Sequence, residues 1–168
     1  FVHLHVHSEY SVVDSTLGIK PLLSLAGECQ QPAIALTDHN NIFALVKFYS
    51  GAMGNGIKPL IGADILIEDE NNEVFSAVLL CMNEQGYLNL SHLISQSYLK
   101  NQKLHNNNEV GLVKKAWLEK HNKGLIALSG GRQGDVGVAL LAEKPNLVAS
   151  RMKWWQTHFS DRFYLELV

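Results

Sequence analysis

The sequence has little cysteine, no long apolar run and no marked excess of either charge. Its two cysteines, Cys29 and Cys81, lie in apolar surroundings and are too few for a disulfide framework, which suits the reducing cytoplasm. No apolar run approaches the roughly 20 residues that a membrane span needs, and no secretory h-region is found. Lys and Arg total 14 against 16 Asp and Glu, and this net charge of −2 gives no general attraction to nucleic acid.

The composition is that of a globular protein. Apolar residues make up 46% of the 168 positions and charged residues 18%, which excludes wholesale disorder. This length suffices for one sizeable core but is short for two, and no linker interrupts it, so we expect a single domain over residues 1–168. The first residue is Phe1 rather than Met, so we expect an excerpt from a longer protein.

Short β-like runs alternate with longer helical ones, which predicts an α/β fold with mostly parallel strands. The acidic, Asn-rich stretch 68–73 joins two apolar runs directly and predicts the turn of one antiparallel hairpin. The stretch 100–109 is the most loop-like. Strands are expected at 2–7, 33–37, 60–67, 74–82, 125–129 and 163–168. Helices are expected at 19–29, 41–53, 87–99, 113–121, 134–141 and 147–158.

Three of the eight histidines fall within five positions at the start of the chain. On a strand, alternate residues share one face, so His3, His5 and His7 would point the same way. Because α/β folds place their chemistry at the carboxyl ends of strands, this cluster is a plausible start to a metal site.

Further candidate ligands stand at other strand ends. Asp38 and His39 follow the run 33–37 directly, Asp64 lies within the third run, and Asp14 lies in the loop after the first. A lone strand histidine is more often a hydrogen-bonded core or surface residue than a ligand, but this combination favours metal binding. The remaining histidines are interpreted as solvated: His92, His105, His121 and His158.

Other patterns have less specific meanings. The stretch 51–56 indicates a helix end, with Gly54 or Gly56 in the left-handed conformation. The stretch 129–135 is either a phosphate-binding turn or a tight strand-to-helix packing, and it matches neither a Walker loop nor a dinucleotide fingerprint. Ser8 and Ser11 have no triad partner in a known motif, which argues against nucleophilic catalysis.

Seven segments carry a resemblance that covers essentially the whole chain. They are Phe1–Ser11 with Asp14, Ala35–Asn41, Val46–Tyr49, Gly56–Asp64, Asn83–Leu90, Gly124–Gly131 and Phe163–Leu167. Together they resemble the PHP (polymerase and histidinol phosphatase) domain found at the N-terminus of bacterial replicative DNA polymerase III alpha subunits. Gly62–Asp64 and Ser129–Arg132 resemble the gammaproteobacterial branch in particular.

The resemblance implies a distorted (β/α)7 TIM-like barrel whose strand ends hold up to three metal ions. It assigns His5 and His7 to the first ligand pair, Asp14 to the next ligand and His39 to the second motif. Asp64 stands where active members usually have Glu, and this shorter carboxylate can still serve as a ligand. His3 shares the face of His5 and His7 but matches no ligand of the family. The last Asp/His motif would lie beyond residue 168, so we expect the barrel to be incomplete at its C-terminus.

Two further positions depart from the family pattern. Ser76 replaces a histidine, and Gly131 replaces a cysteine or histidine. Because a multinuclear site needs its full ligand set, we expect at most one divalent ion (Zn, Mn or Mg) in a residual site.

Two classes of function follow from the resemblance. In the first, the chain is a degenerate, catalytically inactive PHP domain of a DNA polymerase, serving as scaffold and as docking site for the proofreading exonuclease subunit. The whole protein would then synthesise DNA with Mg, contact DNA and the other replicase subunits, and have no membrane partner. In the second, the chain is an active metal-dependent phosphoesterase or 3'-5' exonuclease that uses metal-activated water. The lost ligands favour the first.

Overall fold

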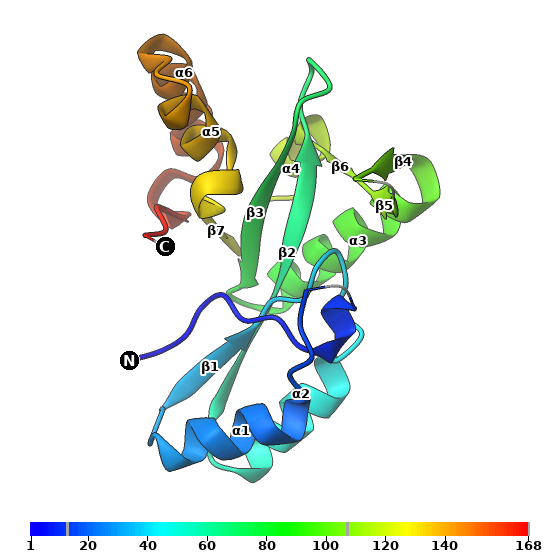
Figure 1. Ribbon diagram of the computed structural model, residues 1–168, viewed down its shortest axis with the longest axis vertical. Helices are drawn as coiled ribbons and strands as arrows, with labels where there is room; N and C mark the ends of the chain where they lie inside the picture. Colours follow the sequence, from blue (N-terminus) through cyan, green and yellow to red (C-terminus); the bar gives the residue numbers. More distant parts are fainter. Residues whose placement is uncertain (13, 107, 168) are drawn as a thin grey trace. The chain divides into compact units, whose positions relative to one another are not determined.

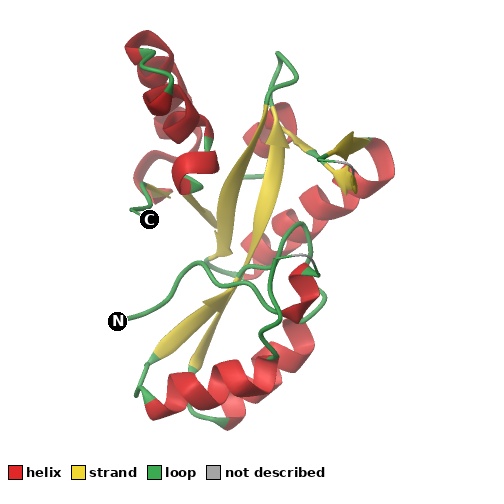
Figure 2. Cartoon of the chain, in the orientation of Figure 1, coloured by secondary structure: helices red, strands yellow, loops and turns green. Residues whose placement is uncertain are grey.

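The computed structural model describes residues 1–12, 14–106 and 108–167, in which helices and strands are interspersed along the chain (Figures 1 and 2). The helices are α1 (Ile19–Glu28), α2 (Leu45–Gly54), α3 (Glu84–Lys100), α4 (Lys115–Lys120), α5 (Asp135–Leu141) and α6 (Pro145–Phe159). The strands are β1 (Ala33–Leu36), β2 (Lys58–Glu68), β3 (Val74–Cys81), β4 (Gln102–His105), β5 (Asn108–Gly111), β6 (Val113–Lys114), β7 (Leu125–Leu128) and β8 (Phe163–Tyr164). Short 3-10 helices are η1 (Glu9–Ser11), η2 (Gly131–Gln133) and η3 (Ser160–Arg162). This mixture of helices and strands, with parallel pairing of β1 and β2, confirms the α/β class.

The chain divides into two compact units, Phe1–Asp64 and Ile65–Val168, and β2 runs through the boundary between them. The single PHP domain over residues 1–168 stays a prediction. No helix of the described residues has both the length and the apolar character to cross a membrane.

In the first unit, α1 and α2 supply the apolar faces of one core. The helix α1 carries Pro21 in its first turn, where the missing N–H is not needed, and buries an apolar stripe of period three to four. The helix α2 buries Phe48 and Ala52 and ends at Gly54; Gly56 then adopts a left-handed φ of +69°, as expected for a helix end. The core is completed by Ile34 and Leu36 of the fully buried β1.

The parallel pairing of β1 with β2 places two candidate ligands side by side. Ala33 faces Lys58 and Leu36 faces Ile61, and the same register continues past the end of β1 to a single bridge between His39 and Asp64. The backbone N–H of Asn40 donates to Asp64 O at 2.8 Å, which extends the pairing by one further step. Parallel pairing therefore determines the separation of His39 and Asp64 before any metal is considered.

The predicted first strand, residues 2–7, is not formed as a strand. The segment runs beside β1 and the residue that follows it: Ala35 N–H donates to His3 O and Thr37 N–H to Val6 O, both at 2.9 Å. The Thr37 side chain adds to these bonds, because Thr37 Oγ1 both accepts from Val6 N–H (2.9 Å) and donates to Val6 O (3.1 Å). The alternation of side chains survives at His5 and His7 without a strand ladder.

The second unit is built on a mixed sheet. The strand β3 neighbours β2 after the short turn 69–73, which allows only an antiparallel hairpin, as predicted. The strand β7 pairs antiparallel with β3, β8 pairs parallel with β7, and β6 pairs parallel with the end of β2. The strands of the described residues form open sheets and no closed barrel.

Three stretches of the second unit differ from expectation. The predicted loop 100–109 contains β4 and the start of β5, which pair as an antiparallel hairpin, although Asn107 lies outside the described residues. Residues 113–114, expected to begin a helix, form β6 instead, and α4 starts only at Lys115. The last predicted strand is confined to β8, and Val168 lies outside the described residues.

Candidate metal centre

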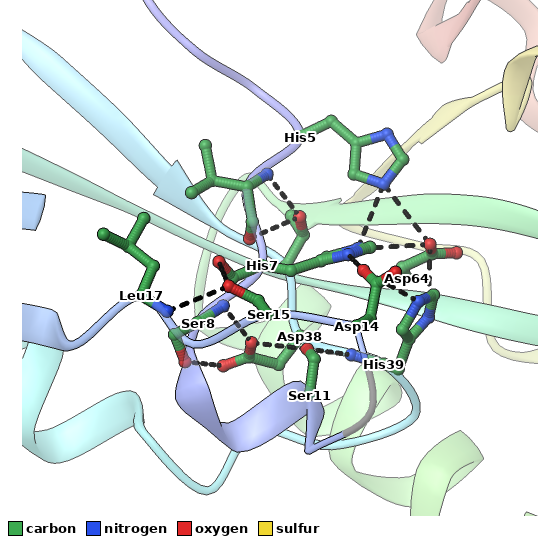
Figure 3. A network of polar contacts seen from close by, with 12 residues as sticks. His5, His7, Ser8, Ser11, Asp14, Ser15, Leu17, Asp38, His39 and Asp64 are labelled. Carbon is green, nitrogen blue, oxygen red and sulfur yellow. Dashed lines mark hydrogen bonds and ion pairs between the residues drawn. The ribbon is translucent and has the colours of Figure 1, made fainter.

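The candidate ligands named from the sequence converge in the first unit (Figure 3). His5 and His7 come from the extended N-terminal segment, Asp14 from the loop after η1, His39 from the end of β1 and Asp64 from β2. Their donor atoms form two groups of three, His5 with His7 and Asp64, and His7 with Asp14 and His39. Within each group the atoms lie within 4.8 Å of one another.

The first group forms a nearly equilateral triangle. His5 Nε2 lies 3.2 Å from His7 Nε2, and each of these atoms lies 3.3 Å from Asp64 Oδ2. Ligand atoms about 2.0–2.1 Å from a tetrahedral zinc ion are roughly 3.3–3.4 Å apart. The triangle therefore has the size of one face of a tetrahedral site, and its two imidazoles and one carboxylate are chemically suited to a divalent ion.

The second group extends the cluster on the other side of His7. His7 Nδ1 is hydrogen-bonded to Asp14 Oδ2, and the same oxygen lies 3.5 Å from His39 Nε2. The rings of His7 and His39 are 4.2 Å apart, and His39 Nδ1 lies 3.3 Å from Asp64 Oδ2. Asp64 Oδ2 is thus close to three imidazoles, while Asp14 contacts two of them.

The electrostatics of the cluster favour charge separation between His7 and its carboxylate partners. Burial of the His7 ring opposes its protonation, but hydrogen bonds to Asp64 and Asp14 outweigh burial and raise the pKa of His7. The hydrogen bond from His7 lowers the pKa of Asp14, against a smaller opposing effect of burial. A bound cation would take the place of this proton between nitrogen and carboxylate.

Asp38, singled out beside His39, is in neither ligand group. Its side chain is only 2% exposed and accepts hydrogen bonds from Ser8 N–H (2.6 Å), Ser8 Oγ (2.8 Å) and Ser11 Oγ (2.7 Å). The Ser11 hydroxyl in turn accepts from the backbone N–H of His39 at 3.1 Å. Ser8 and Ser11 therefore hold a buried carboxylate and form a network that their sequence did not predict; the one signal for it was the polar run directly after a buried strand.

The other histidines lie outside both groups. The His3 ring meets the Phe1 ring edge-on, with ring centroids 4.9 Å apart. The rings of His92 and His121 are tilted against one another with centroids 4.5 Å apart, and burial, followed by the charges of His92 and Lys120, lowers the pKa of His121. The half-buried His158 packs on Trp154 and is hydrogen-bonded to its carbonyl, so it is less solvated than expected.

The two departures from the family pattern lie together in the second unit. Ser76 is buried in β3, and a Cβ on Gly130 would come within 2.2 Å of its carbonyl oxygen. Gly130 and Gly131 adopt φ values of +69° and +54°, and a Cβ on Gly134 would meet Ser129 O at 1.6 Å. A side chain at Gly130 or Gly134 would therefore clash with backbone oxygens, which supports tight packing as the reason for the glycines of the stretch 129–135. The Gly130 N–H donates to Glu166 Oε2 at 2.8 Å, so this amide already has an anionic partner.

Comparison with known families identifies the class of protein. The model of the family described as "PHP domain" matches residues 3–168, and the chain therefore belongs to this family.

The relatives point to one kind of protein. The chain is 44% identical over 170 residues to the DNA polymerase III subunit alpha of Vibrio cholerae and 41% identical over 171 residues to that of Escherichia coli strain K12. Each match covers all of this chain but only 14% of the relative's length. A crystal structure from Bifidobacterium adolescentis, assigned as a metal-dependent phosphoesterase, aligns with a TM-score of 0.54 at 8% identity, covering 94% of this chain and 82% of that one. This likeness supports the fold alone.

Proposed function

We propose that this chain is the N-terminal PHP domain of a replicative DNA polymerase III alpha subunit. Identities of 37–44% over 99–100% of the chain with eight proteins of that name support the assignment. The complete protein would synthesise DNA with Mg in the bacterial cytoplasm, together with the other replicase subunits. The catalytic carboxylates of the polymerase would lie outside these 168 residues.

Within that protein, the domain holds one divalent ion through His5, His7 and Asp64, with His39 and Asp14 beside it. The observation that carries this assignment is the 3.2–3.3 Å triangle of the first three donor atoms. Two imidazoles and a tetrahedral spacing favour Zn over Mg, which prefers octahedral oxygen ligands. When bound, such an ion polarises water or a phosphoryl oxygen.

The domain is catalytically inactive and serves as a scaffold and as the docking site for the proofreading exonuclease subunit. Hydrolysis with two or three ions needs ligands that fix several ions and an in-line water. Among the described residues, both groups of candidate ligands lie in the first unit, and neither includes a residue of the second. Ser76 is a weak neutral ligand and Gly131 offers no side chain, which supports the loss of turnover.

A second candidate function is metal-dependent phosphate-ester or 3'-5' exonuclease hydrolysis. It is favoured by the convergence of five ligand side chains, which is more than one tetrahedral ion needs. In this function Asp14 and His39 would hold a second ion or orient a substrate phosphate.

Metal content measured beside hydrolysis distinguishes the two functions. The protein purified without chelator should retain about one equivalent of Zn and should cleave neither p-nitrophenyl phosphate nor single-stranded DNA with Zn, Mn or Mg. His7→Ala should lose the ion, whereas His105→Ala, a histidine outside both groups, should keep it. Metal-dependent hydrolysis that disappears in His7→Ala would establish the second function instead.

Docking is tested separately. The protein and the proofreading exonuclease subunit of the same organism should elute together from a size-exclusion column when mixed at micromolar concentration. The same mixture with an unrelated PHP phosphoesterase in place of this protein is the control and should elute as two species. Separate elution in both mixtures would contradict the docking proposal and leave the metal assignment untouched.

A further inference from the structure

Three ligands of the candidate metal centre, His5, His7 and Asp14, lie on backbone outside helices and strands. Residues 1–8 form no strand, η1 has only three residues, and the described part of 14–18 is without helix or strand. Yet the donor atoms of His5, His7 and Asp64 converge to within 3.3 Å of one another. Besides the bonds of His3 and Val6 to Ala35 and Thr37, a network of side-chain hydrogen bonds holds this backbone.

The buried Asp38 carboxylate is at the centre of that network (Figure 3). Both of its oxygens accept hydrogen bonds, Oδ1 from Ser8 N–H and Ser11 Oγ, and Oδ2 from Ser8 Oγ. Ser8 is fully buried and Ser11 is 6% exposed, so water does not compete for these bonds.

Each anchored residue is next to a ligand or bonded to one. Ser8 follows His7 in the sequence, and Asp38 precedes His39. Ser11 links η1 to the residues after β1, because its Oγ donates to Asp38 and accepts from His39 N–H. One carboxylate therefore fixes the backbone of ligands that come from the N-terminal segment and from the end of β1.

A second contact acts on the other side of His7. Ser15 Oγ donates to His7 O at 3.0 Å, which ties the loop that carries Asp14 to the same residue. Asn41 Nδ2 donates to Tyr10 O and to His39 O, at 3.1 and 2.9 Å. These bonds lie outside the carboxylate network and would remain if Asp38 were changed.

We propose that Asp38 is a positioning residue of the metal centre: it touches no ion and pre-forms the site by holding His7 and His39 through Ser8 and Ser11. This inference rests on the proposed metal binding. Groups that orient metal ligands typically change metal affinity by roughly 10–100-fold when they are replaced.

The variant Asp38→Asn tests the proposal because it keeps the size of the side chain but places an amide opposite hydroxyl and N–H donors. Its affinity for Zn, measured by titration against a competing chelator, should fall by about 10–100-fold. At saturating Co²⁺ its visible absorption bands should also change in position or intensity, because the ligands no longer hold the same geometry. A purely structural role of Asp38 would not move the Co²⁺ spectrum.

Asp135→Asn is the matched control. Asp135 is 1% exposed and also accepts several hydrogen bonds, but it lies in the second unit and is no member of either ligand group. This variant should lose stability and keep both the Zn affinity and the Co²⁺ spectrum of the unaltered protein.

A milder variant covers the case in which Asp38→Asn fails to fold. Ser11→Ala removes one donor to Asp38 and the acceptor of His39 N–H, and it should weaken Zn binding in the same direction. Unchanged Zn affinity and Co²⁺ spectrum in a folded Asp38→Asn or Ser11→Ala variant would overturn the positioning role. Absence of Zn binding in the unaltered protein would overturn the proposed metal centre itself, which is a different result.

Discussion

At the scale of single residues, the two cysteines differ in reactivity. Cys29 is exposed, whereas burial raises the pKa of the Cys81 thiol to about 12. At pH 8 a thiol with that pKa is ionised in only about one molecule in 10,000, and the thiolate is the reactive form. Labelling with a maleimide should therefore show one fast and one very slow equivalent. Cys29→Ser should remove the fast equivalent alone, and two fast equivalents in the unaltered protein would contradict this.

Single residues also show how far the sequence could predict the candidate site. The sequence could predict the five candidate ligands because histidine and aspartate are common metal ligands. The structure brings the donor atoms of these five residues together: His5, His7, Asp14, His39 and Asp64. The sequence could not predict the network of Asp38 with Ser8 and Ser11. Serine hydroxyls form many kinds of hydrogen bond, and bonds between residues 30 positions apart leave no local sequence pattern. Whether the cluster holds an ion stays a prediction.

At the scale of elements, a buried carboxylate joins three helices of the second unit. Asp135 at the start of α5 accepts from Trp155 Nε1 of α6 at 2.9 Å and lies 3.5 Å from Lys115 Nζ of α4. Asp135→Ala would remove this carboxylate from the largely buried Lys115 ammonium and from the buried indole N–H of Trp155. We expect a loss of about 3–5 kcal/mol in the free energy of unfolding.

Urea denaturation measures this loss. The exposed Asp161 provides the control, since Asp161→Ala should change the free energy of unfolding by no more than about 0.5 kcal/mol. Equal effects of the two substitutions would show that the contacts of Asp135 do not stabilise the helices.

The end of β2 makes a pH-dependent contribution to stability. Burial opposes ionisation of Glu68, but hydrogen bonds from Lys103 and Asn101 outweigh it and lower the pKa of Glu68 below its ordinary value of 4.5. The carboxylate therefore stabilises the folded state fully above about pH 4.5, and the stabilisation is lost as the pH falls through the lowered folded-state pKa.

The variant Glu68→Gln tests this dependence. The difference in free energy of unfolding between the unaltered protein and the variant should be largest above pH 4.5 and should shrink on acidification. Glu70→Gln removes an exposed carboxylate from the turn that follows β2 and should give a small difference at every pH. A difference for Glu68→Gln that does not vary with pH would contradict the expectation.

Elements were predictable where local pattern and packing agree. The helix α1 and the strand β3 were expected within one residue of their ends, because their apolar periodicity reflects the buried face directly. The strands β4 and β5 were missed, since Lys103 and Asn108 have low strand propensity and the hairpin is defined by pairing rather than by composition. The reverse holds for residues 2–7, whose alternation suggested a strand although the segment runs beside β1 without forming one.

At the scale of the whole molecule, charge limits what the chain can bind by itself. The 14 basic residues are outnumbered by 16 acidic ones. Several basic side chains are also committed within the protein: Lys47 to Glu9, Lys115 to Asp135, and Arg151 to Glu73. The sequence could predict this property fully, because net charge needs no structure, whereas the pairing of individual lysines could not be foreseen.

The last prediction concerns DNA. Non-specific binding to nucleic acid depends on counterions that Lys and Arg release from phosphates, so a chain of net charge −2 should bind a single-stranded oligonucleotide weakly. In fluorescence anisotropy we expect a dissociation constant weaker than about 10⁻⁶ M at 50 mM salt and no measurable binding at 200 mM. Added Zn should not change this, because the candidate centre is already balanced by the carboxylates of Asp14 and Asp64. An oligonucleotide of neutral backbone serves as the control for contacts that do not depend on phosphate. Tight binding that persists at 200 mM salt would mean that the chain binds DNA through specific contacts that do not depend on counterion release. Hydrolysis at the metal centre would then have to be tested again.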